Sequence, residues 1–214
     1  MPPAVDAADL TLEDLVRPPD WQNPRPRGTY DVVVIGGGTA GLVSAVGAAG
    51  PGARVAIVER HQLGGDCLIT GCVPSKAIRR TSRAVGELRR ASGLGIHATG
   101  VDLSFPEVMA RMRQRRAGLA VSDSAERLRG LGIDGYFGDA SFISAREIAV
   151  GSATLRFIRA VIATGSRPSA PPIDGLSRRS IAPSWMTRPK GSSGCMMNVA
   201  GCSAARSWRR MPAR

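Results

Sequence analysis

The clearest hydrophobic pattern lies between residues 30 and 59. Residues 30–36 are almost continuously apolar and rich in β-branched side chains, which is typical of a strand buried on both faces of a parallel sheet. Small and apolar residues then recur at helical spacing through residues 40–50, and residues 53–59 repeat the strand pattern. The order of strand, turn, helix and strand predicts a βαβ unit.

Weaker patterns extend this unit along the chain. Residues 77–92 place apolar side chains at helical spacing opposite a face of arginines, and residues 104–133 predict two helices broken near residues 121–123. We expect the charged residues of this second stretch to form a solvated helical face. Residues 132–150 alternate as strands with turns, and residues 155–168 form an apolar strand. The predicted fold class is α/β, with a parallel sheet, a helical insertion and a small β-meander.

The turn of the βαβ unit carries a glycine motif. Residues 36–41, Gly-Gly-Gly-Thr-Ala-Gly, fit the pattern G-x-G-x-x-G. Gly36 permits a tight turn, Gly38 lets the backbone approach a pyrophosphate, and Gly41 lets helix and strand pack closely. Glu59 follows 18 residues after Gly41, where an acid can accept hydrogen bonds from a ribose. The pattern predicts dinucleotide binding, although a tight turn that binds nothing is the alternative, and the motif does not separate FAD from NAD.

Two cysteines lie just beyond the second strand, in the stretch 64–76, GGDCLITGCVPSK. In a straight helix, residues five apart are separated by about 7.5 Å along the axis, and a disulfide needs Cα atoms within about 7 Å. Cys67 and Cys72 can therefore pair only if the backbone between them is distorted. Pro74 suits the first turn of a helix, so we expect Cys72 at a helix N-terminus, where the dipole and Lys76 lower its thiol pKa.

A zinc half-site and two buried thiols are the alternatives to a redox pair. A zinc site needs two further ligands at suitable spacing, and the remaining histidines and cysteines offer none, so we expect no metal site. These residues are His61, His97, Cys195 and Cys202. The acidic start of the chain is unlike an export signal, and the apolar runs are only of strand length. We therefore expect a cytoplasmic protein without a membrane partner.

The net charge of +12 is unevenly distributed along the 214 residues. Residues 177–214 hold eight basic residues and no acidic one, which leaves 21 basic and 17 acidic residues in the rest. A nearly neutral domain with a basic tail is a weak indication of a nucleic-acid surface, so we expect no nucleic-acid partner.

The glycine motif, the second strand and the cysteine stretch together resemble the class I flavoprotein pyridine nucleotide–disulfide oxidoreductases. The cysteine stretch is most similar to the mercuric-reductase-like branch, with Ile69 departing from the asparagine often found there. The resemblance implies a Rossmann-like FAD-binding domain and hydride transfer from NAD(P)H through FAD to a Cys67–Cys72 disulfide. It implies that Cys72 faces the flavin and that Cys67 exchanges with the substrate. That substrate would be Hg(II), lipoamide or another small disulfide.

The same resemblance implies which residues contact FAD. Lys76 would lie near the reactive flavin nitrogen, Asp66 near the flavin-side phosphate, and Ala140 near the adenine. Ala163, Thr164 and Gly165 match a second FAD-contacting motif. The full set of implied cofactor contacts is Gly36, Gly38, Thr39, Ala40, Gly41, Glu59, Gly65, Asp66, Lys76, Ala140, Ala163, Thr164 and Gly165.

We expect three parts in the chain. Residues 1–28 form a Pro-rich, flexible leader, residues 29–176 the N-terminal portion of an FAD-binding domain, and residues 177–214 a basic tail that is disordered or a frameshift product. Family members continue with an NAD(P) domain and a dimer domain, and no second glycine motif follows here. We therefore expect a truncated chain that is not competent alone, with homodimerisation a property of the full-length family. A non-catalytic FAD-binding fragment is the alternative.

Overall fold

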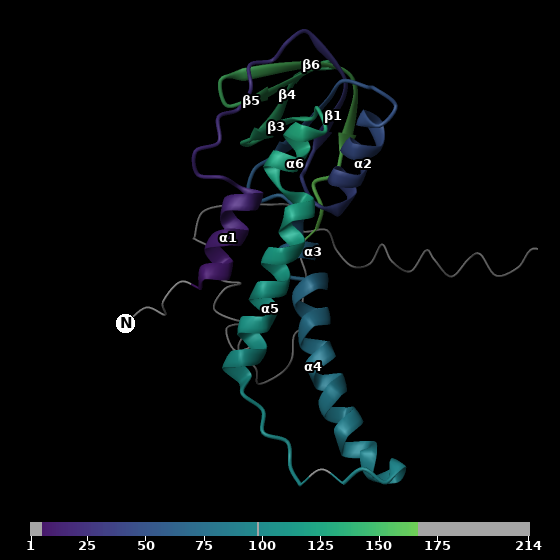
Figure 1. The fold of residues 1–214 in the computed structure, drawn as a ribbon. Helices are drawn as coiled ribbons and strands as arrows, with labels where there is room; N and C mark the ends of the chain where they lie inside the picture. Colours follow the sequence, from purple (N-terminus) through teal and green to yellow (C-terminus); the bar gives the residue numbers. More distant parts are fainter. Residues whose placement is uncertain (1–5, 98, 167–214) are drawn as a thin grey trace, which may run out of the picture. The chain divides into compact units, whose positions relative to one another are not determined.

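The computed structural model describes residues 6–97 and 99–166 and contains a six-stranded sheet, from which helices α4 and α5 extend (Figure 1). The strand order is β3-β2-β1-β6-β5-β4. The strands are β1 (Thr29–Ile35), β2 (Val55–Glu59), β3 (Asp134–Phe137), β4 (Ala140–Ser144), β5 (Glu147–Val150) and β6 (Ala153–Ile162). The helices are α1 (Ala7–Val16), α2 (Thr39–Ala49), α3 (Gly65–Ile69), α4 (Cys72–Arg90), α5 (Phe105–Ala120) and α6 (Ala125–Gly130), with 3₁₀ turns at Ala91–Leu94 and Val121–Asp123.

The middle of the sheet is parallel. Strand β1 pairs in parallel with β2 on one side and with β6 on the other, and β3 adds to β2 in parallel. The two faces of β1 pack into different hydrophobic clusters. Val34 belongs to the cluster formed with the helices, and its neighbour Val33 belongs to the cluster formed with β5 and β6. Burial on both faces explains the continuous apolar run in the sequence. Strands β4, β5 and β6 pair antiparallel as a meander, and the predicted α/β fold is confirmed.

The helical insertion also follows the predicted pattern. Helices α4 and α5 lie side by side (Figure 1). The predicted break near residues 121–123 is a 3₁₀ turn, after which the Ser124 hydroxyl caps α6 by accepting a hydrogen bond from the Arg127 N–H at 3.2 Å. Within the described part of the chain, none of the helices combines the length and the apolar character needed to cross a membrane.

The N-terminal segment differs from the expected flexible leader. Helix α1 begins after Asp6, whose carboxylate accepts a hydrogen bond from the Ala8 N–H at 2.9 Å and so caps the helix. Leu12 and Val16 of α1 are 5% and 0% exposed and belong to the helix-side core. At the end of α1, the Val16 carbonyl accepts a hydrogen bond from the Leu63 N–H at 3.1 Å. Helix α1, which lies in the segment expected to be a flexible leader, therefore contributes to the core.

The residues after α1 cover the edge of the sheet. Strand β3 is an edge strand, and the Asn23 side chain bonds both backbone groups of Phe137, at 2.8 and 2.9 Å. The Trp21 indole N–H donates to the Gly135 carbonyl at 3.2 Å. These side chains satisfy polar groups that an edge strand otherwise leaves open to pairing with another chain. The basic tail, residues 177–214, lies outside the described residues.

Truncating Leu12 tests whether α1 is part of the core. Leu12→Ala is expected to lower the free energy of unfolding by about 2–4 kcal/mol, because it leaves a cavity between α1 and its neighbours. Leu10→Ala removes the same atoms from a side chain of the same helix that is 51% exposed. It should change the free energy of unfolding by less than about 0.5 kcal/mol. Urea unfolding of the full chain measures both, and equal values for the two variants would contradict the packing of α1.

Candidate functional site

The glycine turn lies at the carboxyl end of β1. Gly36 has a φ of 107°, and a Cβ atom there would lie 2.2 Å from the Ala163 carbonyl oxygen. A Cβ atom at Gly41 would lie 1.8 Å from the Gly36 carbonyl oxygen. Backbone atoms therefore occupy the space that side chains would need at both positions. These contacts account for the tight turn and for the close packing of α2 on β1.

Gly38 differs from these two glycines. A Cβ atom at Gly38 would meet only the Gly65 Cα, at an ordinary contact distance of 3.8 Å, and its φ of −77° suits any residue. The fold itself therefore does not require glycine at this position. Thr39 and Ala40, the first two residues of α2, are exposed, and the first N–H groups of a helix have no partners within it. An anion can approach here, which is the role that the motif assigns to its second glycine.

The Glu59 carboxylate lies against the glycine turn. It accepts hydrogen bonds from the Gly37 N–H at 2.6 Å and from the His61 N–H at 2.7 Å, one on each oxygen. The sequence motif assigned Glu59 to a ribose and gave no signal of this structural role. Each carboxylate oxygen can accept more than one hydrogen bond, so the arrangement leaves capacity for ribose hydroxyls.

The remaining predicted contacts lie at the same edge of the sheet. Ala163 follows β6, and its N–H donates to the Ile35 carbonyl at 2.8 Å, while Gly165 has a φ of 71°. Ala140 begins β4, two residues after Gly138, whose N–H donates to the Glu59 carbonyl at 3.0 Å. The structure thus brings segments from three parts of the sequence to the carboxyl ends of parallel strands, where ligands of open α/β sheets bind.

The cysteine stretch is joined to the glycine turn by backbone contacts. The Gly64 N–H donates to the Gly37 carbonyl at 2.8 Å, and Gly38 forms an isolated parallel bridge with Gly64. Gly65 has a φ of 55°, and a Cβ atom there would lie 2.7 Å from the Gly38 Cα. Asp66 is exposed in the first turn of α3. The start of the cysteine stretch therefore lies directly against the turn predicted to hold a pyrophosphate.

The backbone between the two cysteines is interrupted, as their spacing required. Cys67 lies in the short helix α3, and Cys72 is the first residue of α4. Between the two helices, the Asp66 carbonyl accepts hydrogen bonds from the N–H groups of Thr70, at 3.0 Å, and Gly71, at 2.6 Å. This turn places Cys67 close enough to Cys72 to shift the pKa of the Cys72 thiol. Both cysteines are free thiols, Cys67 half-buried and Cys72 exposed.

The pKa of the Cys72 thiol is shifted opposite to the expected direction. A hydrogen bond that the Cys72 thiol donates to the neighbouring Cys67 sulfur, and then the negative charge of that sulfur, raise the pKa of Cys72. Lys76, one turn along α4, lowers this pKa but does not outweigh Cys67. Two sulfur atoms that share a site disfavour two thiolates, as two carboxylates disfavour double ionisation. Lys76 therefore lowers this pKa as expected, but the expected net lowering of the Cys72 pKa is wrong for the dithiol form.

One residue of this site carries no signal in the sequence. Arg116 lies in the stretch that we expected to be a solvated face, yet it is only 8% exposed. Its guanidinium Nη1 donates to the Ile69 carbonyl at 2.9 Å, between the two cysteines.

Within the described residues, no group of three or more histidine, cysteine or acidic side chains could hold a metal ion. Cys195 and Cys202 lie outside the described residues.

Glycine substitutions within α2 test the packing of the turn. Gly41→Ala should lower the free energy of unfolding by about 2–3 kcal/mol, because the new methyl group overlaps the Gly36 carbonyl. Gly47 lies in the same helix, where an added methyl group would meet no neighbouring segment within 4 Å, so Gly47→Ala should raise this free energy by about 0.5–1 kcal/mol. Denaturant titration distinguishes the two, and a stabilising Gly41→Ala would contradict the contact.

Alkylation kinetics test the coupling of the two thiols. Cys67→Ala removes the hydrogen bond and charge that raise the Cys72 pKa. The reaction of Cys72 with iodoacetamide in the reduced protein should therefore reach half its maximal rate at a lower pH. Lys76→Met removes a cation that lowers the same pKa, so its midpoint should move to a higher pH than in the parent chain. Shifts in the same direction for both variants would show that the two neighbours do not oppose each other.

Much of this chain is similar to known proteins. Residues 30–192 match the family model described as pyridine nucleotide-disulphide oxidoreductase. The chain is similar to dihydrolipoyl dehydrogenases from Acholeplasma laidlawii (32% identical over 152 residues), Chlamydia muridarum (35% over 158) and Bacillus subtilis (35% over 164). These alignments cover 69%, 71% and 69% of this chain but only 44%, 33% and 34% of the relatives. The chain belongs to the pyridine nucleotide-disulphide oxidoreductase family.

Proposed function

We propose that this chain binds FAD at the glycine turn and uses Cys67 and Cys72 as a redox-active pair. The observation that carries the proposal is the backbone junction between Gly64 and the turn residues Gly37 and Gly38. It holds the dithiol stretch and the nucleotide motif together at the carboxyl edge of the sheet. A disulfide reduced by a bound cofactor needs this proximity, whereas a turn that binds nothing does not.

The residues at this edge fit the ADP half of FAD. Gly38 leaves room for a pyrophosphate at the N-terminus of α2, and the Glu59 carboxylate has capacity for ribose hydroxyls. The exposed Lys76 lies on the same helix as Cys72 and offers a cation for negative charge that develops nearby. When bound, FAD supplies the hydride-accepting chemistry that links NAD(P)H to the disulfide.

The thiols would act by exchange. Reducing the Cys67–Cys72 disulfide takes two electrons and two protons, and the resulting thiolate attacks a substrate disulfide through a mixed disulfide. We assign exchange to Cys67 and the cofactor-facing position to Cys72. This assignment rests on the family resemblance rather than on exposure, because Cys72 is the more exposed thiol. The raised pKa of Cys72 favours a dithiol that keeps one proton while the other sulfur reacts.

The names of the relatives support a proposal for the substrate class. They are named dihydrolipoyl dehydrogenases, so we propose a small lipoyl-type disulfide, with Hg(II) as the alternative suggested by the cysteine stretch. The chain spans less than half the length of these relatives. A cytoplasmic location, where thiols are kept reduced, is therefore part of the proposal, while sustained NAD(P)H oxidation and homodimerisation are proposed only for the full-length family.

Gly38→Ala tests FAD binding without disturbing the core. The substitution should lower the free energy of unfolding by no more than about 1 kcal/mol, the scale of a helix N-cap change. It should weaken FAD affinity at least about tenfold, because the methyl group enters the space of the pyrophosphate. Titration of the full chain with FAD, followed by flavin fluorescence, measures the affinity. Unchanged affinity in Gly38→Ala, or no binding by the parent chain, would contradict the proposed site.

The catalytic proposal is separated from a non-catalytic FAD-binding fragment by one further measurement. After saturation with FAD, the oxidised chain is mixed with NADH or NADPH, and free thiols at Cys67 and Cys72 are counted by alkylation and mass spectrometry. Appearance of both thiols in the parent chain, and neither in a sample without FAD, supports electron transfer. FAD binding without thiol formation favours the fragment.

A further inference from the structure

Arg116, a buried arginine of α5, donates a hydrogen bond to the turn between the two cysteines. We propose that Arg116 is a positioning residue for the Cys67–Cys72 pair, and that helix α1 holds Arg116 in place. The inference rests on the proposed function, since it concerns the pairing of these thiols. Helix α1 precedes residue 30, where the family match begins, so this support belongs to a part of the chain outside that match.

The first contact lies at the end of α3. Ile69 is the last residue of this short helix, and the final carbonyl groups of a helix lack partners within it. Arg116 Nη1 donates to the Ile69 carbonyl at 2.9 Å. A basic side chain commonly satisfies such carbonyls at a helix C-terminus. The bond fixes the backbone midway between Cys67 and Cys72, where the direction of the chain changes.

The second contact lies on the other side of the guanidinium. Arg116 Nη2 forms an ion pair with the Asp9 carboxylate of α1. Among the described residues, Arg116 Nε has no hydrogen-bond partner, so these two groups carry its polar contacts. A buried cation is costly without a counter-charge. Asp9 therefore supplies the counter-charge and holds the guanidinium directed at the turn.

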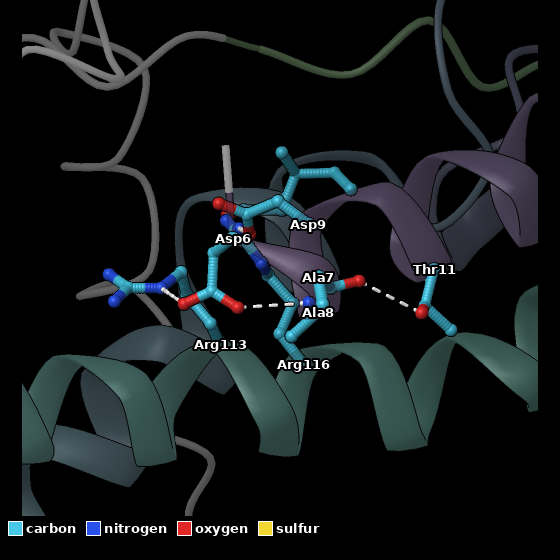
Figure 2. A network of polar contacts seen from close by, with 8 residues as sticks. Asp6, Ala7, Ala8, Asp9, Thr11, Arg113 and Arg116 are labelled. Carbon is cyan, nitrogen blue, oxygen red and sulfur yellow. Dashed lines mark hydrogen bonds and ion pairs between the residues drawn. The ribbon is translucent and has the colours of Figure 1, made fainter. Parts of the chain in front are cut away.

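A neighbouring ion pair supplies a matched control. Figure 2 shows Arg113 and Arg116 on the same face of α5, with Arg113 bonded to Asp6 and Arg116 close to Asp9. Both pairs join α1 to α5. Arg116 bonds the cysteine turn as well as α1, whereas Arg113 bonds Asp6 of the N-terminal segment. Replacing Arg113 therefore removes a contact to the start of α1 alone, whereas replacing Arg116 also removes the contact to the cysteine turn. Comparing the two variants distinguishes the docking of α1 from the positioning of the dithiol.

Helix α5 also contacts the other side of the cysteine pair. Arg111 Nη1 donates to the Ala77 carbonyl of α4 at 3.1 Å. The two helices that carry the cysteines are thus both held by arginines of α5. Holding both sides keeps the sulfur atoms at a high effective concentration, which favours the disulfide over the dithiol. Loss of the Ile69 contact should loosen the turn and shift the equilibrium toward the dithiol.

The experiment equilibrates the full chain with glutathione buffers and measures the fraction of disulfide by alkylation after acid quenching. Each disulfide that is reduced consumes two glutathione thiols and forms one glutathione disulfide. Arg116→Met should lower the equilibrium constant for forming the Cys67–Cys72 disulfide about fivefold, the scale of one net hydrogen bond. Arg116→Lys, which keeps the charge beside Asp9 but not the forked donor, should give a smaller shift in the same direction.

Arg113→Met is the matched control and should leave this constant within about twofold, although it too removes an ion pair between α1 and α5. Asp9→Asn should shift the constant in the same direction as Arg116→Met. Equal constants for the Arg113 and Arg116 variants, or no shift in Arg116→Lys and Arg116→Met, would overturn the positioning role. An unchanged constant in Asp9→Asn would overturn the part assigned to α1. If the parent chain forms no Cys67–Cys72 disulfide in any buffer, the proposed function fails instead.

Discussion

The site depends on close backbone contacts at the carboxyl end of β1. The Gly36 and Gly41 positions leave no space for side chains, because carbonyl oxygens of the turn and of Ala163 occupy it. These contacts set where α2 begins and bring the end of β6 against the turn. The bond from Gly64 to Gly37 then fixes the cysteine stretch to the same turn. Backbone atoms make every one of these contacts, so changes of side-chain rotamer cannot compensate for their loss.

Much of the fold follows from patterns that are local in the sequence. The βαβ unit, the break after α5 and the meander depend on residues within one or two elements, and the structure confirms them. The interruption between Cys67 and Cys72 was also predictable, because a disulfide distance and helix geometry exclude a straight helix. The segments at the carboxyl edge could be grouped from the sequence because parallel strands end at one edge.

The rest depends on contacts between distant residues. Asp9 and Arg116 are 107 positions apart, and no periodicity relates them. The contribution of α1 to the core was not predicted, because composition says nothing about the surface that Leu12 covers. Arg116 lies among other arginines on α5. Only the packed structure shows that Arg116 is buried, because the sequence does not distinguish it from its more exposed neighbours. The pKa of Cys72 was misjudged because the nearby Cys67 outweighs Lys76, an effect that requires the distance between the sulfurs.

The burial of Arg116 is hard to explain by stability alone. A buried charge loses its hydration, so an apolar side chain of similar volume is often neutral or favourable in its place. In this pair the charge that is buried is the guanidinium, since the Arg116 side chain is 10% exposed and the Asp9 side chain 37%. Leu12 of α1 and Ala117 of α5 belong to one hydrophobic cluster, so apolar residues already occupy the core to which these two helices contribute. What an apolar side chain cannot provide is a donor for the Ile69 carbonyl. The energetic cost of a buried guanidinium is therefore best understood as the cost of fixing the turn between the two cysteines.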